Sequence, residues 1–360
     1  MAQKRVCVIE GEDASPEAVR PVVRLIEAMD LGIKWVYPPV GEKGLQQYDS
    51  IFPDAARDAI DDSNTTLFGA ASGKSVFALM YLRWGKQTFA NVRPATFMPG
   101  CKSPLARPNG IDFVIVRENT EDLYLMVEGD LEDLKKSGLV SPILQKSVSE
   151  IGEGKYGVKV ITRSASERIA CFAFDLARRR KKEGLPGKVT ASSKYNMLSQ
   201  SDGLFVDIAR ETAKDYPDII FETMIVDNLA HFMVMNPEKL DVVLLPNLYG
   251  DLLSDAAAGL IGGLGLAPSG CFGTDYAYFE PAHGTAPDIA GKNTINPTAT
   301  LLSAVMMLEY LGFAETAGEI TSALKTVYRK GKCLTPDQGG GASTTEFIGA
   351  VARELKINHD

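Results

Sequence analysis

The chain has 360 residues, of which 45% are hydrophobic and 23% are charged, values typical of a globular protein with a substantial core. At roughly 100–200 residues per domain, this length predicts two domains. The formal net charge of -8 at pH 7 argues against sequence-independent binding to nucleic acid or to an anionic membrane, although a local basic pocket can still collect an acidic small molecule.

The N-terminal residues and the cysteines predict a cytoplasmic protein. The chain begins directly with a strand-like pattern, MAQKRVCVIE, so we expect no signal peptide. The longest apolar stretch, residues 256–270, is broken by glycines and a proline and does not reach membrane-spanning length. The cysteines are dispersed without a C-x-x-C pair, which is typical of reduced intracellular proteins; they are Cys7, Cys101, Cys171, Cys271 and Cys333.

Strand-like apolar runs alternate with helix-like segments along the chain, which favours an α/β fold around a largely buried sheet. Helices are expected from about Ser15 to Met29, up to about Phe89, and after several later strands. The expected strands are residues 5–10, 65–68, 113–118, 158–163, 188–193, 221–227 and 241–247.

Residues 164–184 carry the clearest helix signals. Ser164 and Glu167 fit a Ser-x-x-Glu capping box, and the apolar residues that follow have the spacing of one buried helix face. The basic run 178–182 stands just before Gly184, which suits the last turn of a helix and its glycine cap better than a nucleic-acid patch.

Residues 65–82, TTLFGAASGKSVFALMYL, have the context of a phosphate-binding loop but not its spacing. Phe68 stands where a Walker A motif requires its first glycine. A Rossmann fingerprint is also unsupported, because Pro268 replaces the third glycine in GGLGLAPSG. We therefore expect neither a P-loop enzyme nor a Rossmann site.

Two aspartates predict a divalent-metal site. Asp251 and Asp255 lie four residues apart at the start of an expected helix, so their carboxylates share one face and repel each other unless a cation neutralises them. Oxygen ligands of this kind suit Mg²⁺ or Mn²⁺. The alternative, attraction of acidic residues to a helix N-terminus, accounts more easily for one of them than for both. Asp227, which ends an apolar run, is a third candidate or else a turn former.

Arginines at the borders of apolar segments predict a site for an acidic ligand. An arginine at the end of a buried strand needs an anion, either a protein carboxylate or a ligand carboxylate held by two hydrogen bonds. Each one alone favours a structural role, whereas three of them near a tyrosine and a lysine in comparable positions favour a site for a polyacid. The residues are Arg83, Arg93, Arg117, Tyr124 and Lys194.

Several long motifs resemble the metal-dependent β-decarboxylating dehydrogenases, which include isocitrate, 3-isopropylmalate, homoisocitrate and malate or tartrate dehydrogenases. The resemblance is strong from Arg83 to the C-terminus. It is weaker in GEDASPE (11–17), which keeps only the first glycine and the Pro-Glu of the family's G-D-G-I-G-P-E loop. The motifs are RENTEDLY (117–124), SSKYNMLSQSDGLF (192–205), MIVDN (224–228), NLYGDLLSDAAAGLIGGLGLAPSG (247–270) and EPAHGTAPDIAGKNTINPTATLLSA (280–304).

This resemblance implies a two-domain α/β fold of the isocitrate/isopropylmalate dehydrogenase type with a non-Rossmann dinucleotide site. A large cofactor domain, residues 1–90 and 262–360, would be discontinuous around a smaller substrate and dimerisation domain, residues 91–261, with an arm near 127–156. The resemblance also implies a homodimer whose subunits share their active sites.

The same resemblance implies a role for each charged candidate. Arg83, Arg93 and Arg117 would hold the substrate carboxylates. Asp251 and Asp255 would bind the divalent metal together with Asp227 of the partner subunit. Lys194 of the partner subunit would be the general base for the substrate hydroxyl, and Tyr124 would protonate the enolate carbon after carbon dioxide leaves.

Residues 283–297, HGTAPDIAGKNTINP, resemble the family's nucleotide loop. Asp288 and Ile289 stand where the NADP enzymes carry Lys and Tyr. An aspartate accepts hydrogen bonds from both ribose hydroxyls and repels a 2′-phosphate, so the expected cofactor is NAD. Without the family, His283 alone would favour a structural role. The other implied contacts of the cofactor are Gly284, Ala286 and Asn296.

The stretch before Arg83 leaves the substrate open. Phe77 and Leu79 replace the Ser and Asn of isocitrate enzymes, and Lys74 and Ser75 are candidates to contact a distal carboxylate instead. The apolar residues 76–80 either belong to a helix core or favour an apolar substituent. Isocitrate is the first expectation, from RENTEDLY and GGLGLAPSG. The alternatives are 3-isopropylmalate, homoisocitrate, D-malate or tartrate and, in another class, a non-catalytic regulatory subunit.

Overall fold

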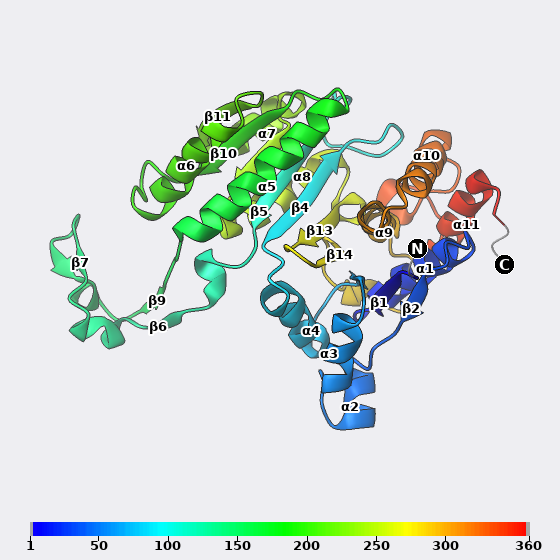
Figure 1. Cartoon of the computed structure of the whole chain (residues 1–360), viewed down its shortest axis with the longest axis horizontal. Helices are drawn as coiled ribbons and strands as arrows, with labels where there is room; N and C mark the ends of the chain where they lie inside the picture. Colours follow the sequence, from blue (N-terminus) through cyan, green and yellow to red (C-terminus); the bar gives the residue numbers. More distant parts are fainter. Residues whose placement is uncertain (1–2, 358–360) are drawn as a thin grey trace.

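A computed structural model describes residues 3–357 and has a ten-stranded mixed β-sheet at its centre (Figure 1). The strand order is β11-β10-β12-β5-β4-β13-β14-β3-β1-β2, and the expected α/β fold is confirmed. The strands are β1 (Arg5–Ile9), β2 (Lys34–Val36), β3 (Thr65–Phe68), β4 (Ala90–Thr96), β5 (Asp112–Glu118), β10 (Lys188–Ser193), β11 (Ile220–Ile225), β12 (Val242–Leu245), β13 (Pro268–Phe272) and β14 (Ala277–Pro281).

The two flanks of the sheet are parallel and its centre is antiparallel. Strands β11, β10, β12 and β5 form a parallel group, and β4 and β13 run antiparallel to their neighbours. The carboxyl ends of parallel strands meet at one edge of a sheet, where ligands commonly bind in α/β proteins. The segments that follow β5, β10, β11 and β12 therefore begin at the same edge.

Helices cover both faces of the parallel group, as its buried strands require. Helices α5 and α6 pack on one face and α7 and α8 on the other, while α1, α9, α10 and α11 continue the second layer. None of the described helices is both long and apolar enough to cross a membrane. The helices are α1 (Ser15–Glu27), α2 (Glu42–Tyr48), α3 (Asp54–Asp61), α4 (Val76–Met80), α5 (Arg163–Lys182), α6 (Ser201–Thr212), α7 (Val226–Met235), α8 (Asn247–Ile261), α9 (Thr298–Leu311), α10 (Ala314–Lys330) and α11 (Thr344–Leu355).

Side-chain alternation along β5 decides which face receives its terminal arginine. Phe113 and Ile115 belong to the core that includes α8, whereas Val114 and Val116 belong to the core under α5. Successive side chains of a strand point to opposite faces, so Arg117 is the next member of the series that faces α8. The guanidinium of Arg117 therefore lies against α8, the helix that carries Asp251 and Asp255.

Three local predictions are wrong. Residues 158–163 do not form a strand; they return from residue 157 beside the segment 122–127, and Asp122 N–H donates to the Val160 carbonyl at 2.9 Å. The cap of α5 is Thr162 rather than Ser164, since its Oγ1 accepts from the Ala165 N–H at 3.2 Å. The helix expected to reach Phe89 ends at Gly85 in a π-helical turn. The predicted C-terminus of α5 is confirmed, with Lys182 last and Gly184 at φ 91°.

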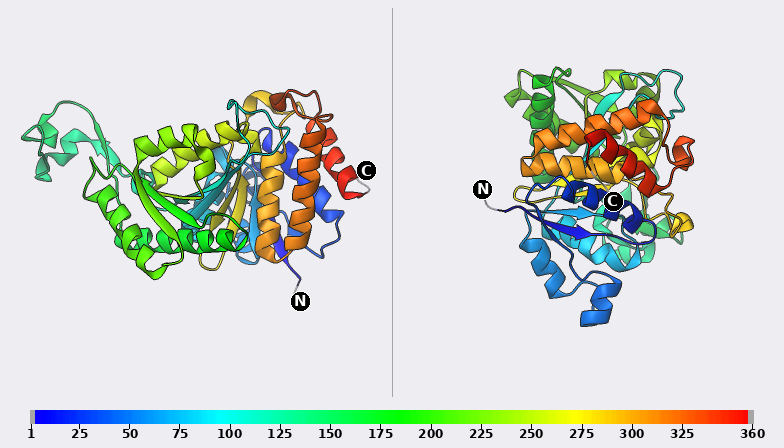
Figure 2. Two further views of the ribbon diagram at one scale, coloured as in Figure 1. Left: turned by 90° about the horizontal axis from the view of Figure 1, so that it is seen from above. Right: turned by 90° about the vertical axis from the view of Figure 1, so that its right-hand side faces the viewer.

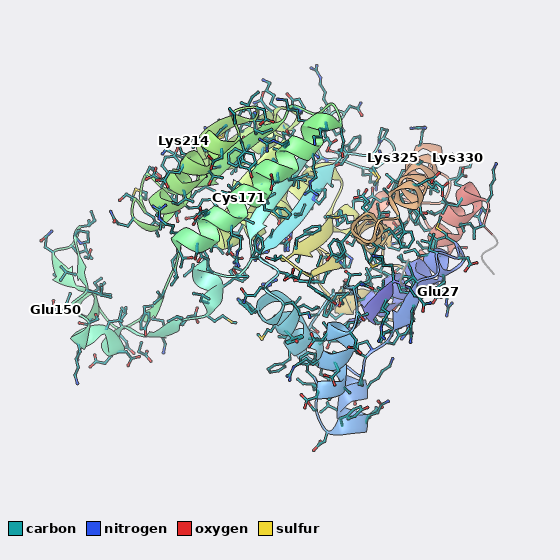
Figure 3. The ribbon with its side chains drawn as sticks, viewed as in Figure 1. Glu27, Glu150, Cys171, Lys214, Lys325 and Lys330 are labelled. Carbon is teal, nitrogen blue, oxygen red and sulfur yellow. The ribbon has the colours of Figure 1, made fainter. Side chains whose placement is uncertain are left out.

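Residues 127–156, which we call the arm, extend away from the rest of the molecule (Figures 1 and 2). Strands β6 (Glu128–Asp130) and β9 (Lys155–Gly157) form its base, and β7 (Val140–Ser141) and β8 (Lys146–Ser147) form a second small sheet. Glu150 lies on the arm, while α10 and α11 lie at the opposite end of the molecule (Figures 2 and 3). The division into domains 1–90 with 262–360 and 91–261 stays a prediction, because the sheet continues across both.

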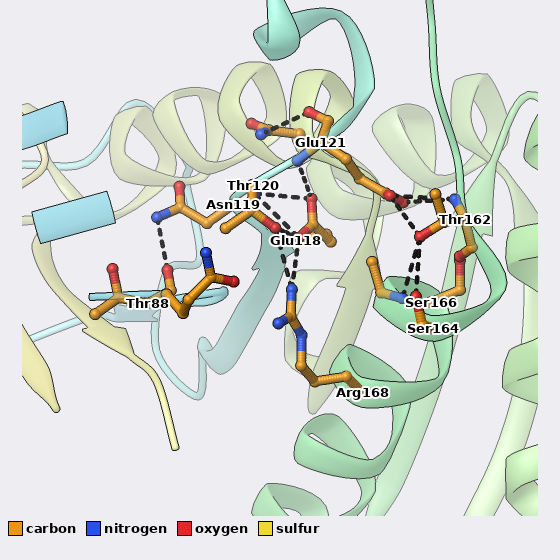
Figure 4. Close-up of polar contacts among 12 residues, drawn as sticks. Thr88, Glu118, Asn119, Thr120, Glu121, Thr162, Ser164, Ser166 and Arg168 are labelled. Atoms are coloured by element: carbon orange, nitrogen blue, oxygen red, sulfur yellow. Dashed lines mark hydrogen bonds and ion pairs between the residues drawn. The ribbon is translucent and has the colours of Figure 1, made fainter. Parts of the chain in front are cut away.

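Polar contacts fasten the start of α5 to the turn after β5 (Figure 4). The Glu121 carboxylate accepts hydrogen bonds from the Thr162 N–H at 3.0 Å and from its hydroxyl at 2.8 Å. The neighbouring Glu118 carboxylate accepts from the Thr120 and Glu121 N–H groups. Burial raises the pKa of Glu121 to about 7, against the opposing effect of the bonds from Thr162.

This pKa predicts that stability falls as pH rises from 4.5 to about 7, because the unfolded chain loses the Glu121 proton while the folded chain keeps it. Glu121→Gln removes this titration, so the decrease in unfolding free energy across this pH interval should become smaller by on the order of 3 kcal/mol. Urea unfolding at several pH values measures it. Glu27→Gln, at an exposed glutamate of α1 (Figure 3), should keep the original slope. An unchanged slope in Glu121→Gln would contradict the prediction.

Candidate active site

Arg117 is buried at the end of β5, against the first turns of α8. Its Nε and Nη2 donate to Oδ1 of Asn247 at 2.8 and 2.6 Å, and its Nη1 donates to Asp251. Gly250 makes room for this side chain, since a Cβ there would lie 2.6 Å from Arg117 Cγ. The guanidinium is therefore fixed by hydrogen bonds on one side and by close backbone packing on the other.

Arg93, on the adjacent strand β4, reaches the same helix. Its Nη1 donates to Ser254 Oγ at 2.7 Å and to Asp255 Oδ1 at 3.1 Å, and it lies 3.5 Å from Asp251 Oδ1. Asp251 and Asp255 share a helix face, as predicted from their spacing. The guanidinium groups of Arg93 and Arg117 neutralise the carboxylates of Asp251 and Asp255. Repulsion between the two cations and between the two anions is thereby offset.

Tyr124 joins this cluster from the 3₁₀ helix after β5. Its hydroxyl donates to Asp251, and its ring centroid lies 4.8 Å from Arg117 Cζ. Burial, followed by the hydrogen bond to Asp251, raises the pKa of Tyr124, so the phenol is protonated at neutral pH. Burial, followed by repulsion from Arg93, lowers the pKa of Arg117 to about 10, which still leaves a cation.

The two aspartates differ in their titration. Burial raises the pKa of Asp251, but Arg117 and the Tyr124 hydrogen bond outweigh it, so the net pKa lies below its usual range. Burial raises the pKa of Asp255, and the attraction of Arg93 does not fully compensate. The site thus holds one firmly ionised carboxylate beside a second that ionises less readily, and a cation placed between them would favour ionisation of both.

Arg83 lies in the π-helical turn after α4, next to the ends of β13 and β14. Burial opposes its charge, yet Tyr278 and the buried Glu280 raise the pKa of Arg83. Within residues 3–357, the Nε atoms of Arg83 and Arg93 are buried and have no hydrogen-bond partner. Unsatisfied buried donors are costly, so these two atoms fit a site that awaits an anionic ligand.

Lys194 and Asp227 form a separate pair at the same sheet edge. They follow the neighbouring strands β10 and β11, and Lys194 Nζ lies 2.7 Å from Asp227 Oδ1. This contact lowers the pKa of Asp227. Among the described residues, no three His, Cys, Asp or Glu side chains are grouped closely enough to hold a metal ion, so Asp227 does not join Asp251 and Asp255 within one chain.

The loop after β14 carries the predicted cofactor residues. Ala14 N–H donates to the Thr285 carbonyl at 3.0 Å, and Ala286, in the left-handed region, packs with Ile289 against the N-terminus of α1. Asn296 is buried and donates to Asp337 at 2.9 Å, so it ties this loop to the chain before α11. Gly284 and Asp288 are exposed.

In this loop, the ring of His283 offers a hydrogen-bond acceptor to a ligand. Its Nδ1 lies 2.8 Å from the Gly284 carbonyl, and burial lowers the pKa of His283, so the ring is neutral and Nδ1 carries the proton. Its Nε2 is then a buried acceptor, without a hydrogen-bond partner in the described part of the chain. A ligand with an N–H or amino group would satisfy it.

Comparison with protein-family models matches residues 5–351 to "Isocitrate/isopropylmalate dehydrogenase". The chain belongs to the isocitrate/isopropylmalate dehydrogenase family. It is 42% identical to a 3-isopropylmalate/3-methylmalate dehydrogenase of Methanocaldococcus jannaschii, with 98% of this chain and 99% of that one covered. It is 38% identical to the NAD isocitrate dehydrogenase alpha subunit of Bos taurus, with 98% and 91% covered.

Structure comparison gives the same family. The crystal structure of isocitrate dehydrogenase from Methylococcus capsulatus matches with a TM-score of 0.85 and 36% identity, over 98% of this chain and 99% of that one. The family consists of decarboxylating dehydrogenases that act on small carboxylic acids. The motif resemblance in the sequence is thereby confirmed, and so is the isocitrate/isopropylmalate dehydrogenase fold.

In this member of the isocitrate/isopropylmalate dehydrogenase family, hydrogen bonds join residues 11–17 to the loop before Arg83. The Glu12 carboxylate accepts from the N–H groups of Ser72 and Ser75 and, at 2.8 Å, from the Ser75 hydroxyl. Ser15 Oγ accepts from the Ala70 N–H at 2.7 Å. The GEDASPE segment (11–17) therefore supplies hydrogen-bond acceptors for the loop before Arg83.

Lys74 and Ser75, the candidates for a distal substrate carboxylate, are already engaged. Lys74 pairs with Glu42 of α2, and Ser75 is buried against Glu12. Both line a cleft of about 560 Å³ between residues 8–16, 37–43 and 72–75, whose walls include none of the three arginines. Their role in substrate binding stays a prediction.

Three residues of this site were not predicted from the sequence. Asn247 accepts the two hydrogen bonds of Arg117, Glu280 is a buried carboxyl beside Arg83, and Glu12 holds the loop 72–75. Asn247 lies four residues before Asp251, and Glu280 ends an apolar run, so the spacing and strand-end arguments that found the other residues apply to both. Nothing local marks Glu12.

Gly250→Ala should lower turnover by roughly 10–100-fold, because its Cβ would push Arg117 out of position. Steady-state kinetics with whichever carboxylic acid gives turnover measures the loss. The matched control is Gly259→Ala in the same helix, where an added Cβ meets nothing within 4 Å. That variant should keep turnover and gain about 0.5–1 kcal/mol of stability. Equal turnover in the two variants would contradict the packing argument.

Proposed function

We propose that the protein catalyses the NAD-dependent and divalent-metal-dependent oxidative decarboxylation of a (2R)-malate-type 2-hydroxy acid. The observation that carries this proposal is the cluster in which Arg93 and Arg117 face Asp251, Asp255 and Tyr124. Buried arginines would bind substrate carboxylates, paired aspartates would bind a cation, and a protonated phenol would supply a proton. The names of the relatives support this proposal: both are dehydrogenases of this family, and the name of one of them specifies NAD.

The residues present fit both expected cofactors. Asp251 and Asp255 offer carboxylate oxygens on one helix face, and Asp227 of the partner subunit would complete the set in a homodimer with shared sites. The free Nε2 of His283 and the exposed Asp288 suit an adenosine group. When bound, the divalent cation would polarise the substrate hydroxyl and NAD would accept the hydride.

Two protein groups would move protons. Lys194 of the partner subunit would take the proton of the 2-hydroxyl as C2 is oxidised, and the neutral phenol of Tyr124 would give its proton to C3 after carbon dioxide leaves. Arg83, Arg93 and Arg117 would hold the acid so that the C2 hydrogen and the departing carboxylate are correctly oriented. The protonated state of Tyr124 at neutral pH supports its assignment as the acid.

The loop before Arg83 favours a small apolar substituent at C3 of the acid, of the 3-isopropylmalate type. Phe77 of α4 is 55% exposed, so its apolar surface is available to a substituent of the substrate. Lys74 and Ser75 are occupied by Glu42 and Glu12. Isocitrate is the second candidate, since the Lys74–Glu42 pair is exposed and Lys74 can exchange this partner for a substrate carboxylate.

The decisive assay follows NADH at 340 nm with NAD and Mn²⁺, offering 3-isopropylmalate, isocitrate, homoisocitrate, D-malate and tartrate in parallel. We expect the highest kcat/KM with 3-isopropylmalate, loss of activity in EDTA, and weak activity with NADP because Asp288 repels its 2′-phosphate. Preference for isocitrate would place Lys74 on the substrate. Absence of NADH formation with every acid, from folded protein that binds NAD, would reject catalysis and favour a regulatory subunit.

Lys194→Met should lower kcat by a factor on the order of 10²–10⁴, because the hydroxyl then loses its proton acceptor. Binding of the acid in the presence of Mn²⁺, measured by calorimetry, should remain detectable. Lys214→Met, at an exposed lysine after α6, is the control and should keep normal turnover. Substantial turnover in Lys194→Met would remove this lysine from the mechanism.

A further inference from the structure

Lys159 is a mostly buried cation between two fully buried carboxylates. Its side chain is 14% exposed, and its Nζ lies 2.6 Å from Asp202 Oδ1 and 3.6 Å from Asp122 Oδ1. The same ammonium lies 4.4 Å from the ring centroid of Tyr249. In the part of the chain that the structure describes, no other basic side chain pairs with either carboxylate.

Each of these partners adjoins a residue proposed to act in the reaction. Asp202 accepts a hydrogen bond from the Lys194 N–H at 2.7 Å through its second oxygen. Asp122 begins the 3₁₀ helix that carries Tyr124, and its second oxygen accepts from the Leu248 N–H at 3.0 Å. Tyr249 lies in α8, two residues before Asp251. The Lys159 ammonium therefore contacts three structural elements near the site, which are the 3₁₀ helix of Tyr124, α6 and α8.

The energetics make Lys159 necessary to this arrangement. A fully buried carboxylate without a counter-charge is strongly unfavourable, and here two of them depend on one lysine. Asp122 also has φ 71°, a left-handed conformation that is costly for a residue with a side chain. Without the ammonium, Asp122 and Asp202 would move toward water or take up a proton, and either response would weaken the contacts that hold the Tyr124 helix and the Lys194 turn.

We propose that Lys159 is a positioning residue that fixes the Tyr124 helix and the Lys194 turn relative to each other. This inference rests on the proposed function, in which Lys194 serves the active site of the partner subunit while Tyr124 serves the site of its own chain. One Lys159 therefore supports both active sites of the dimer, and its removal from one chain impairs both.

Lys159→Met should lower kcat by roughly 10–100-fold, the scale expected when reacting groups are displaced by about 1 Å. The KM for NAD should change little, because the loop 283–296 lies outside these contacts. Lys159→Arg, which keeps the charge, should recover most of the turnover. The control is Lys155→Met, at an exposed lysine of β9 that pairs with Asp130 on the arm. Full turnover in folded Lys159→Met would overturn the proposal.

Mixed dimers test the link between the two sites. A dimer with one Lys159→Met chain and one unmodified chain should fall well below half of normal activity, since both sites are affected. A dimer that joins one Lys194→Met chain to one Tyr124→Phe chain should keep about half of normal activity, because in shared sites both changes fall in one site and the other stays complete. Half activity or more in the Lys159 mixed dimer would overturn the link. Near-complete loss of activity in the dimer of Lys194→Met and Tyr124→Phe chains would reject the shared-site arrangement instead, and leaves the homodimer test of Lys159 standing.

Amide hydrogen exchange provides a readout that does not need activity. Lys159→Met should speed exchange in residues 122–125 and 194–203 together, relative to Lys155→Met. If Lys159→Met does not fold, Lys159→Gln keeps a polar side chain without the charge and should speed exchange in the same two segments. Faster exchange in only one segment, or in neither, would overturn the proposed coupling.

Discussion

Arg117 ends β5 as a cation buried against α8, and such a cation is stable only where the protein supplies hydrogen-bond acceptors and negative charge. Asn247 and Asp251 supply both, and Gly250 leaves the space that the side chain requires. Once Asp251 is fixed in this way, Arg93 and Tyr124 take their positions around it. The geometry of the candidate active site therefore depends on one contact between a strand end and a helix start.

The topology of the sheet explains why the functional groups collect at one edge but in two clusters. Strands β5, β12, β10 and β11 are parallel neighbours, so the segments that follow them all begin at that edge. Lys194 pairs with Asp227 there, apart from the arginines and from Asp251 and Asp255. A chain that holds both clusters in a fixed relation is suited to a dimer in which each site takes one cluster from each subunit. The buried Lys159, between Asp122 and Asp202, provides that fixed relation.

Glu12 and Ser15 hold the loop before Arg83 against the start of α1. Backbone N–H groups in this loop require acceptors, and Glu12 supplies them for Ser72 and Ser75. Ser15 does the same for Ala70, and Gly69 leaves room for its hydroxyl, since a Cβ there would lie 2.3 Å from Ser15 Oγ.

The sequence by itself determined the features that depend on local periodicity. These are the alternation of strands and helices, the shared helix face of Asp251 and Asp255, and the basic C-terminus of α5. The tertiary structure alone decided the features that depend on a distant partner. Asn247 meets Arg117 across 130 residues of chain, and Thr162 caps α5 while Glu121 binds its N–H and hydroxyl. Residues 158–163 have the composition of a strand but do not form one, because they follow segment 122–127 through isolated backbone hydrogen bonds rather than a continuous ladder. Their Lys159 is the counter-charge of two aspartates that no local pattern connects to it.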